Sequence, residues 1–327
     1  MPPGARLPVG VIGVGALGRH HARHLATIDD AELVGVYDID PQVGSAVASD
    51  VGTRSWASLD DLLERVEAVS IAVPTTEHLA VGLAALGRGV PVLMEKPLAG
   101  TLAEADQLVG AASRAGVQLQ VGHIERFNRS LRAAEPYLDG PLYLESHRVA
   151  PFQPRGTDVA VVLDLMIHDL DLMLHLTGGG AATDVRASGV AVLSNHLDMA
   201  NARVEFANGA VALATASRLA RERVRRLRLV QPSGYLSLDM AAGTGVFMKL
   251  KPGWRPGMAD RVSDIADMIP LIAPEADALK LELTSFIHAI QGGREAVVTG
   301  SEGRRALALA LQVTESVQRT PGQSTHD

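Results

Sequence analysis

The sequence predicts an α/β protein with two domains. Its 327 residues exceed the usual size of one domain, and a mean hydropathy of +0.14 is sufficient for buried cores. The first third alternates short apolar runs with longer helical patterns, whereas closely spaced strand-like runs dominate between about residues 185 and 250. We therefore expect a doubly wound parallel sheet in residues 1–122 and a second domain with an antiparallel sheet in residues 123–327.

The first domain is predicted from strands that are apolar throughout, which is typical of a parallel sheet covered by helices on both faces. The predicted strands are Val9–Val14, Leu33–Tyr37, Ala68–Val73, Val90–Met94 and Val117–Val121. The helical patterns between them are Leu17–Ile28, Val43–Ala48, His78–Arg88 and Leu102–Ala115.

The pattern changes after about Gly122. We expect, in order, a helix near Arg129–Leu138, a strand at Leu142–Val149, a helix from about Val159 to Leu176, and final helices at about Ala276–Gln291 and Ser301–Arg319. The turn signals Asn208-Gly209 and Ser233-Gly234 separate strand-like runs, which predicts hairpins of an antiparallel sheet. The proline-containing stretch 252–274 is expected to be a surface excursion.

Composition excludes several classes of function. A formal charge of −7 argues against nucleic-acid or membrane-surface partners, which need clustered positive charge. The absence of cysteine excludes disulfides, thiolate nucleophiles and cysteine-ligated zinc, so redox chemistry requires a bound cofactor. No apolar run approaches the roughly 18 residues of a membrane span, and the N-terminal run is too short for a signal peptide, so we expect a cytoplasmic protein.

The motif Gly13-x-Gly15-x-x-Gly18 follows the first predicted strand and opens a helix. Its glycines allow a tight turn, the approach of the backbone to a pyrophosphate, and close packing of helix on strand. An ordinary glycine-rich turn is the alternative interpretation. Against it, Asp38 ends the second strand 20 residues past Gly18, where its carboxylate can accept hydrogen bonds from both ribose hydroxyls of NAD. A carboxylate repels a 2′-phosphate, and the next arginine is Arg54, so NAD is favoured over NADP.

Two further segments follow later strands, where ligands bind in open α/β sheets. Pro74-Thr75-Thr76-Glu77-His78 follows the third strand, and Glu95-Lys96-Pro97 follows the fourth. Lys96 is the only lysine in the first 248 residues. An ordinary solvated loop lysine is the alternative interpretation. The position of Lys96 after the fourth strand favours a chemical role, because an amine can change its protonation state and a guanidinium cannot.

The predicted helix over 159–176 carries Asp164, His168, Asp171 and His175 at helical spacing among apolar residues. Three interpretations compete: a polar face without chemistry, an Asp/His metal site, and general acid–base catalysis by His168 with a carboxylate that orients it. No third set of ligands is evident, so we expect no metal. Charges in such apolar surroundings are expected to be buried and paired.

We assign no catalytic or metal-binding role to the other polar clusters. Within an arginine-rich stretch, Arg226 and Arg228 lie on one strand face and Leu227 and Leu229 on the other, which predicts a solvated sheet face or an interface. Three histidines of the first helix are interpreted as surface residues rather than metal ligands: His20, His21 and His24.

Together, these motifs resemble the Gfo/Idh/MocA family of NAD(P)-dependent sugar oxidoreductases over nearly the whole chain. The resemblance rests on the glycine motif, Pro74–His78, Glu95-Lys96-Pro97, Asp164…His168 and the junction Gly122-His123-x-x-Arg126-Phe127-Asn128. It implies a Rossmann fold in the first domain and, in the second, an open-faced, mostly antiparallel sheet that supports homodimers or homotetramers. It also implies a cis peptide bond before Pro97.

The resemblance implies roles for individual residues. Lys96 and His168 would flank the reacting substrate carbon beside the nicotinamide, with Asp164 as their near neighbour. The implied cofactor contacts are Gly13, Gly15, Ala16, Leu17, Gly18, Asp38, Pro74, Thr75, His78 and Glu95. The implied substrate contacts are Lys96, Arg126, Asn128, Arg155, Asp164 and His168, and Arg148 is a further candidate.

Two segments, Val121–Asn128 and Asp164–Asp169, look like the branch that includes UDP-N-acetylglucosamine 3-dehydrogenases. That branch oxidises the sugar 3-hydroxyl before transamination, on the way to amino-sugar lipid A or surface polysaccharide. We therefore expect hydride transfer from C3 of a UDP-N-acetylhexosamine to NAD⁺, with His168 or Lys96 as the base and a downstream aminotransferase as a partner. The alternatives are a free polyol or sugar dehydrogenase of the inositol type and a non-catalytic NAD-sensing regulator.

Overall fold

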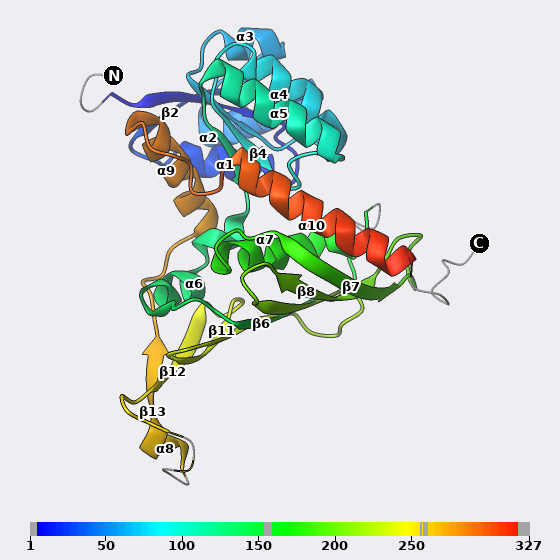
Figure 1. Cartoon of the computed structure of the whole chain (residues 1–327). Helices are drawn as coiled ribbons and strands as arrows, with labels where there is room; N and C mark the ends of the chain where they lie inside the picture. The colour runs from blue at the N-terminus through cyan, green and yellow to red at the C-terminus, as the bar shows by residue number, and fades with distance from the viewer. Residues whose placement is uncertain (1–4, 154–158, 256, 258–260, 320–327) are drawn as a thin grey trace. The chain divides into compact units, whose positions relative to one another are not determined.

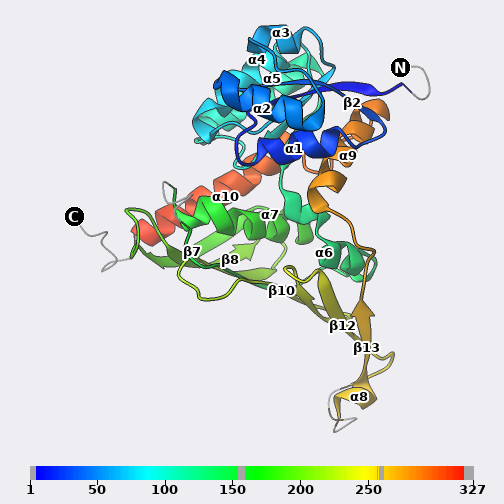
Figure 2. The ribbon, with the colours of Figure 1, turned by 180° about the vertical axis from the view of Figure 1, so that it is seen from behind.

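The computed structural model describes residues 5–153, 159–255, 257 and 261–319 (Figures 1 and 2). The chain forms two compact units, each with its own sheet. The first unit comprises residues 1–124 and 276–307, and the second comprises residues 125–275 and 308–327. Residues 276–307, which the sequence boundaries assign to the second domain, thus pack with the first unit.

The first unit contains a five-stranded parallel sheet in the order β2-β1-β3-β4-β5, which confirms the predicted doubly wound fold. Its strands are β1 (Leu7–Ile12), β2 (Ala31–Tyr37), β3 (Ala68–Ile71), β4 (Val92–Glu95) and β5 (Leu119–Gly122). Its helices are α1 (Gly18–Leu25), α2 (Pro41–Val51), α3 (Leu59–Leu63), η1 (Thr75–Glu77), α4 (His78–Leu86), α5 (Leu102–Ala115) and α9 (Ala278–Gln291). The strand order reverses between β1 and β3, which is the position where such sheets bind ligands.

Helix α9 belongs to the first unit because its apolar face completes the core there. Leu283, Phe286 and Ile287 are spaced three and four residues apart and lie on one helix face. They are fully buried in the same cluster as Val9 of β1 and Leu25 of α1. The chain therefore returns to its first sheet after the second sheet is complete.

The second unit contains an eight-stranded sheet in the order β13-β12-β11-β10-β6-β9-β8-β7. Its strands are β6 (Tyr143–Val149), β7 (Ala182–Val190), β8 (Met199–Phe206), β9 (Val211–Ser217), β10 (Val224–Gln231), β11 (Gly234–Asp239), β12 (Thr244–Leu250) and β13 (Ala266–Leu271). The shorter helical elements are η2 (Ile124–Phe127), α6 (Arg129–Ala134), η3 (Glu135–Tyr137) and α8 (Val262–Ile265). Only the β6–β9 pair is parallel among the described strand pairs of this sheet, so the predicted mostly antiparallel sheet is confirmed.

Helix α7 (Ile167–Leu176) lies across one face of the second sheet, against β6 and β9 (Figure 1). A π-helical turn, η4 (Val162–Met166), precedes it without interruption. The last helix, α10 (Gly300–Gln318), packs its C-terminal part against β7, where Ser316 accepts a hydrogen bond from the backbone N–H of Ala187. No helix in the described ranges has the length and apolar character that a membrane crossing requires.

Strand β13 corrects the interpretation of 252–274 as a surface excursion. Its residues pair with β12 in continuous antiparallel register from Ala266 to Leu271. It is an edge strand of the sheet, which is where a strand tolerates a proline such as Pro270. The prolines therefore made this strand difficult to recognise in the sequence, and its pairing with β12 defines it.

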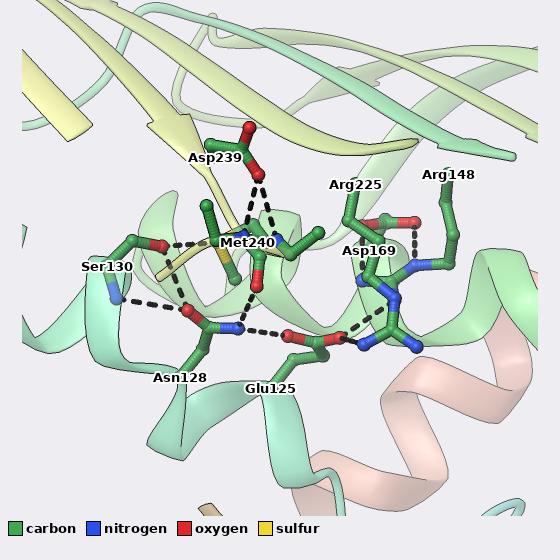
Figure 3. A network of polar contacts seen from close by, with 10 residues as sticks. Glu125, Asn128, Ser130, Arg148, Asp169, Arg225, Asp239 and Met240 are labelled. Carbon is green, nitrogen blue, oxygen red and sulfur yellow. Dashed lines mark hydrogen bonds and ion pairs between the residues drawn. The ribbon is translucent and has the colours of Figure 1, made fainter. Parts of the chain in front are cut away.

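A largely buried set of three arginines and three carboxylates joins the elements of the second unit, and Figure 3 shows four of them, Glu125, Arg148, Asp169 and Arg225. Arg148 of β6 donates from Nε and Nη2 to both carboxylate oxygens of Asp169 at 2.7 and 3.0 Å, and from Nη1 to Glu125 at 2.8 Å. Arg225 of β10 donates to the same Glu125 oxygen at 3.4 Å. Arg126 and Asp171 form a second bidentate pair, at 2.6 and 2.8 Å.

This cluster fixes helix α7 against the sheet. Burial alone would lower the pKa of Arg148, but the charges of Asp169 and Glu125 outweigh burial and raise it. Asp171 is buried and paired as expected, and so is Asp169, whereas Asp164 and His168 are partly exposed and His175 is exposed. Because the cluster contains equal numbers of opposite charges, each ion compensates the desolvation of another.

Replacement of Arg148 by methionine tests this role. It leaves Asp169 and Glu125 buried without their main cation, so we expect the free energy of unfolding of the second unit to fall by about 3–5 kcal/mol. Denaturant unfolding followed by circular dichroism measures the change. Arg226→Met on the exposed side of β10 is the matched control, with an expected change within about 0.5 kcal/mol. Equal losses in the two variants would contradict the assignment.

Candidate active site

The glycine motif forms the turn between β1 and α1. Gly13 has a φ of +78°, and a Cβ atom at Gly18 would lie 1.8 Å from the carbonyl oxygen of Gly13. At Gly15, in contrast, nothing lies within 4 Å of the position of a Cβ atom. The first and third glycines thus allow close packing, and Gly15 leaves open space beside the start of α1, which has no side-chain cap. This space fits the pyrophosphate of a dinucleotide.

Asp38 lies against this turn after the end of β2. Its Oδ2 accepts a hydrogen bond from the backbone N–H of Val14 at 2.8 Å, and its Oδ1 accepts one from Asp40 at 3.0 Å. The carboxylate is partly exposed and held in one orientation, as a ribose acceptor requires. The Arg54 guanidinium stacks 4.0 Å above the ring of Trp56.

The segment after β3 is anchored by His78. Its ring is buried, with Nδ1 3.0 Å from the carbonyl oxygen of Pro97 and Nε2 3.1 Å from that of Val73. Burial lowers the pKa of His78, against the opposing effect of these carbonyl groups. The histidine predicted to contact a cofactor therefore ties the β3 loop to the β4 loop, whereas Pro74 is exposed and Thr75 partly exposed.

Glu95 and Lys96 lie at the end of β4. Glu95 places Oε1 3.0 Å from Nε2 of His21, and its Oε2 accepts a hydrogen bond from the backbone N–H of Lys96 at 3.2 Å. Burial alone would raise the pKa of Glu95, but the hydrogen bond and charge of His21, with the charge of Lys96, hold it below its ordinary value. The Lys96–Pro97 peptide bond is cis, which confirms that expectation.

Parallel strands place these residues at one edge of the first sheet. β1, β2, β3 and β4 run in the same direction, so the segments that follow them share the carboxyl edge. The residues gathered there are Gly13, Gly15, Ala16, Leu17, Gly18, Asp38, Pro74, Thr75 and Lys96. Ala16, Leu17 and Lys96 retain exposed surface in this unit.

The remaining catalytic candidates lie in the second unit. Asp164 is part of the π-helical turn η4, and His168 is the second residue of α7. Both are partly exposed, whereas Asp169 beside His168 is buried. The sequence pattern predicts one regular helix here and contains no signal for the π turn, a feature that occurs often at functional sites. Among the described residues, no group of three or more His, Asp or Glu side chains is arranged to hold a metal ion.

Two of the proposed substrate contacts direct their polar groups into the protein. Arg126 forms its bidentate pair with Asp171. Asn128 caps α6 through Ser130 and donates to Glu125 and to the carbonyl oxygen of Met240, both at 2.9 Å (Figure 3). Arg155 lies outside the described residues.

Sequence reasoning missed His21. Its interpretation as a surface residue is wrong: the side chain is 1% exposed and contacts Ser70 and Glu95, whereas His20 is exposed and His24 partly exposed. The spacing of residues along the helix could have indicated this burial, because His21 lies on the same face of α1 as the buried Gly18 and Leu25.

Comparison with known proteins agrees with this geometry. A family model described as "Oxidoreductase family, NAD-binding Rossmann fold" matches residues 7–123, and one described as "GFO/IDH/MocA C-terminal domain" matches residues 139–237. The UDP-N-acetylglucosamine 3-dehydrogenase of Acidithiobacillus ferrooxidans is 41% identical over 310 residues, which cover 94% of this chain and 96% of that protein. A solved structure of that enzyme has a TM-score of 0.89 at 40% identity and covers 96% of this chain and 98% of that one.

A more distant relative and a more distant structure also span almost the whole chain. The myo-inositol 2-dehydrogenase of Thermotoga maritima is 25% identical over 329 residues, covering 95% of this chain and 96% of that protein. A structure of levoglucosan dehydrogenase in complex with NADH has a TM-score of 0.84 at 18% identity, covering 96% and 98% of the two chains, and shows the shared fold. With residues 7–123 and 139–237 matched by models of one family and a relative 41% identical over 94% of the chain, the protein belongs to the GFO/IDH/MocA family of oxidoreductases and is an NAD-dependent enzyme.

Proposed function

We propose that this protein oxidises the 3-hydroxyl of a UDP-N-acetylhexosamine to the 3-keto sugar while NAD⁺ is reduced to NADH. The observation that carries the proposal is the similarity to the A. ferrooxidans UDP-N-acetylglucosamine 3-dehydrogenase, at 41% identity over 94% of this chain and 96% of that enzyme. The segments Val121–Asn128 and Asp164–Asp169 support the same branch of the family.

The first unit would hold NAD through the carboxyl edge of its sheet. The pyrophosphate fits the open space at Gly15, and the oriented Asp38 carboxylate accepts the ribose hydroxyls. Bound NAD⁺ supplies the hydride acceptor. Pro74, Thr75, His78 and Glu95 complete the proposed contacts, with His78 and Glu95 acting through the loops that they anchor.

Lys96, His168 and Asp164 are the proposed catalytic residues. Lys96 or His168 takes the proton of the 3-hydroxyl as the hydrogen on C3 leaves with its electron pair for the nicotinamide, so that a ketone remains. Where His168 is the base, a protonated Lys96 stabilises the negative charge that develops on the sugar oxygen. Asp164, four residues before His168, is the third proposed catalytic residue.

Support for the substrate contacts differs between residues. The polar atoms of Arg126 and Asn128 are engaged with Asp171, Glu125 and the backbone at Met240, which supports a role in shaping the second unit. Arg155 is retained as a candidate contact for the diphosphate.

In the cell, we propose a cytoplasmic homo-oligomer whose keto product is consumed by an aminotransferase, on the way to amino-sugar lipid A or surface polysaccharide. The face of the second sheet that bears Arg226 is the face proposed for contact with a second copy, because the opposite face is already buried within the unit. Leu227 and Leu229, on the other face, are buried, as the strand pattern predicts. Arg228 on the exposed-charge face is paired with Glu145 at 3.2 Å.

A substrate panel tests the reaction. With NAD⁺ present, we expect NADH and a 3-keto sugar with UDP-N-acetylglucosamine and no product with the same nucleotide sugar lacking its 3-hydroxyl, because the reacting O–H is then absent. NADH absorbance and mass spectrometry of the sugar measure the outcome. Turnover of free myo-inositol in preference to the nucleotide sugar would identify the inositol-type alternative, and NAD binding without turnover of any sugar would identify a regulator.

Replacement of Lys96 by methionine tests the catalytic assignment. We expect kcat to fall at least about 100-fold, because a positioned proton-transfer group contributes that much or more, while NAD⁺ binding measured by calorimetry is retained. Lys249→Met, the same change at an exposed residue of β12, is expected to leave kcat unchanged. Near-normal turnover in the Lys96 variant would disprove its role.

A pair of glycine variants tests the NAD site. Gly15→Ala places a methyl group in open space where the pyrophosphate is proposed to lie, so we expect near-normal stability and an NAD⁺ Kd raised at least about tenfold, equivalent to one lost charge-assisted hydrogen bond. Gly18→Ala would clash with the backbone of Gly13 and is expected to destabilise the first unit itself. Unchanged NAD⁺ affinity in folded Gly15→Ala would place the pyrophosphate elsewhere.

A further inference from the structure

His21 joins three elements of the first unit through one buried imidazole ring. It lies on α1, with Nδ1 2.7 Å from Oγ of Ser70 on β3 and Nε2 3.0 Å from Oε1 of Glu95 at the end of β4. His21 is 1% exposed and Ser70 is 0% exposed, so water does not compete for these contacts. The glycine turn, β3 and the strand before Lys96 are thereby linked.

The direction of the hydrogen bonds follows from Glu95. As a carboxylate, Glu95 only accepts hydrogen bonds, so Nε2–H of His21 donates to Oε1. The Ser70 hydroxyl can then donate to Nδ1, or accept from it when the ring is protonated. The other oxygen of Glu95 accepts the backbone N–H of Lys96 at 3.2 Å. A continuous chain of hydrogen bonds therefore runs from Ser70 through His21 and Glu95 to Lys96.

The neighbouring strand leaves room for this arrangement. Gly122 of β5 pairs with Glu95, and a Cβ atom at Gly122 would lie 3.3 Å from the carboxyl carbon and Oε2 of Glu95. The titratable groups that act on Glu95 are His21 from α1 and Lys96 from the end of β4, and Glu95 in turn acts on His78 of α4. The titratable side chains of α1, of α4 and of the end of β4 thus interact with the Glu95 carboxylate.

Lys96 has anchored residues on both sides in the sequence. Glu95 before it is held by His21, and Pro97 after it contacts the His78 ring through its carbonyl oxygen. The backbone that carries the amine therefore has few alternative positions. A carboxylate beside an amine also favours the ammonium form of that amine.

We propose that His21 is a positioning residue for Lys96: through Ser70 and Glu95 it fixes the backbone at Lys96 and holds the Glu95 carboxylate beside that backbone. The inference extends the proposed function, since it rests on the catalytic role given to Lys96 there. Loss of the His21 donor leaves Oε1 of Glu95 without this hydrogen bond, so the carboxylate and the Lys96 backbone that it holds gain alternative positions.

The scarcity of lysine makes a direct test practical. The chain contains four lysines, Lys96, Lys249, Lys251 and Lys280, so NMR of protein labelled with ¹³C at lysine Cε gives four signals, and the signal lost in Lys96→Met belongs to Lys96. In Glu95→Gln we expect the pKa of Lys96 to fall by about one unit, because the negative charge that acts on Lys96 is removed, with the other three lysines as unchanged internal references. His20→Leu, a change at an exposed residue of α1, is expected to leave all four pKa values unchanged.

Kinetics and rescue separate positioning from general stability. We expect His21→Leu to lower kcat about tenfold with the KM for NAD⁺ unchanged, and His21→Gln, whose amide can donate to Glu95, to restore kcat in large part. A folded His21→Leu protein with the kcat of the wild type would overturn the proposal.

Glu95→Gln keeps the proposal testable if His21→Leu does not fold. It removes the charge but keeps the shape of the side chain, so the pKa of Lys96 must fall, and an unchanged value overturns the proposal. The titration needs no substrate, so its result does not depend on which sugar is oxidised. Normal turnover in Lys96→Met would refute the catalytic assignment while leaving the titration interpretable.

Discussion

A buried or nearly buried carboxylate stands next in sequence to each of the two proposed proton-transfer residues, and the rest of the site depends on how these carboxylates are satisfied. Glu95 precedes Lys96 and is held by His21; Asp169 follows His168 and is held by Arg148. A carboxylate removed from water requires donors of its own, so each one draws neighbouring elements into contact with it. The same requirement organises both units, although their sheets differ.

Neighbouring residues in this arrangement have different roles. The anchored carboxylates restrict the backbone, while Lys96 and His168 beside them keep part of their side chains exposed for chemistry. Arg126, which the sequence proposed as a substrate contact, forms a buried ion pair with Asp171 in the second unit. In a chain without cysteine, the oxidation itself is left to NAD, and the protein contributes orientation, charge and proton transfer.

Local patterns were sufficient for most of the fold and for the glycine turn beside Asp38, where NAD is proposed to bind. The apolar strands of the first unit, the Asn208-Gly209 hairpin and the glycine turn are each encoded by a few adjacent residues, because turn conformation and strand burial are short-range constraints. Strand β13 was missed because Pro270 weakens its signal, and pairing with β12 across a connecting loop supplies what the local sequence lacks. The sequence boundaries placed helix α9 in the second domain for a similar reason, since its apolar face is compatible with the core of either unit.

The sequence by itself determined the alternation of strands and helices and the Gly13–Gly18 turn with Asp38, and it led to the proposal that Lys96 has a chemical role, since all of these rest on spacing and residue type. Only the tertiary structure decided what the polar side chains contact. His21 meets Ser70 and Glu95 from 49 and 74 residues away, and Arg148 meets Asp169 from 21 residues away. Such partners are chosen by packing, because a buried charge is satisfied by whichever donor the fold brings to it, and no local pattern records that choice.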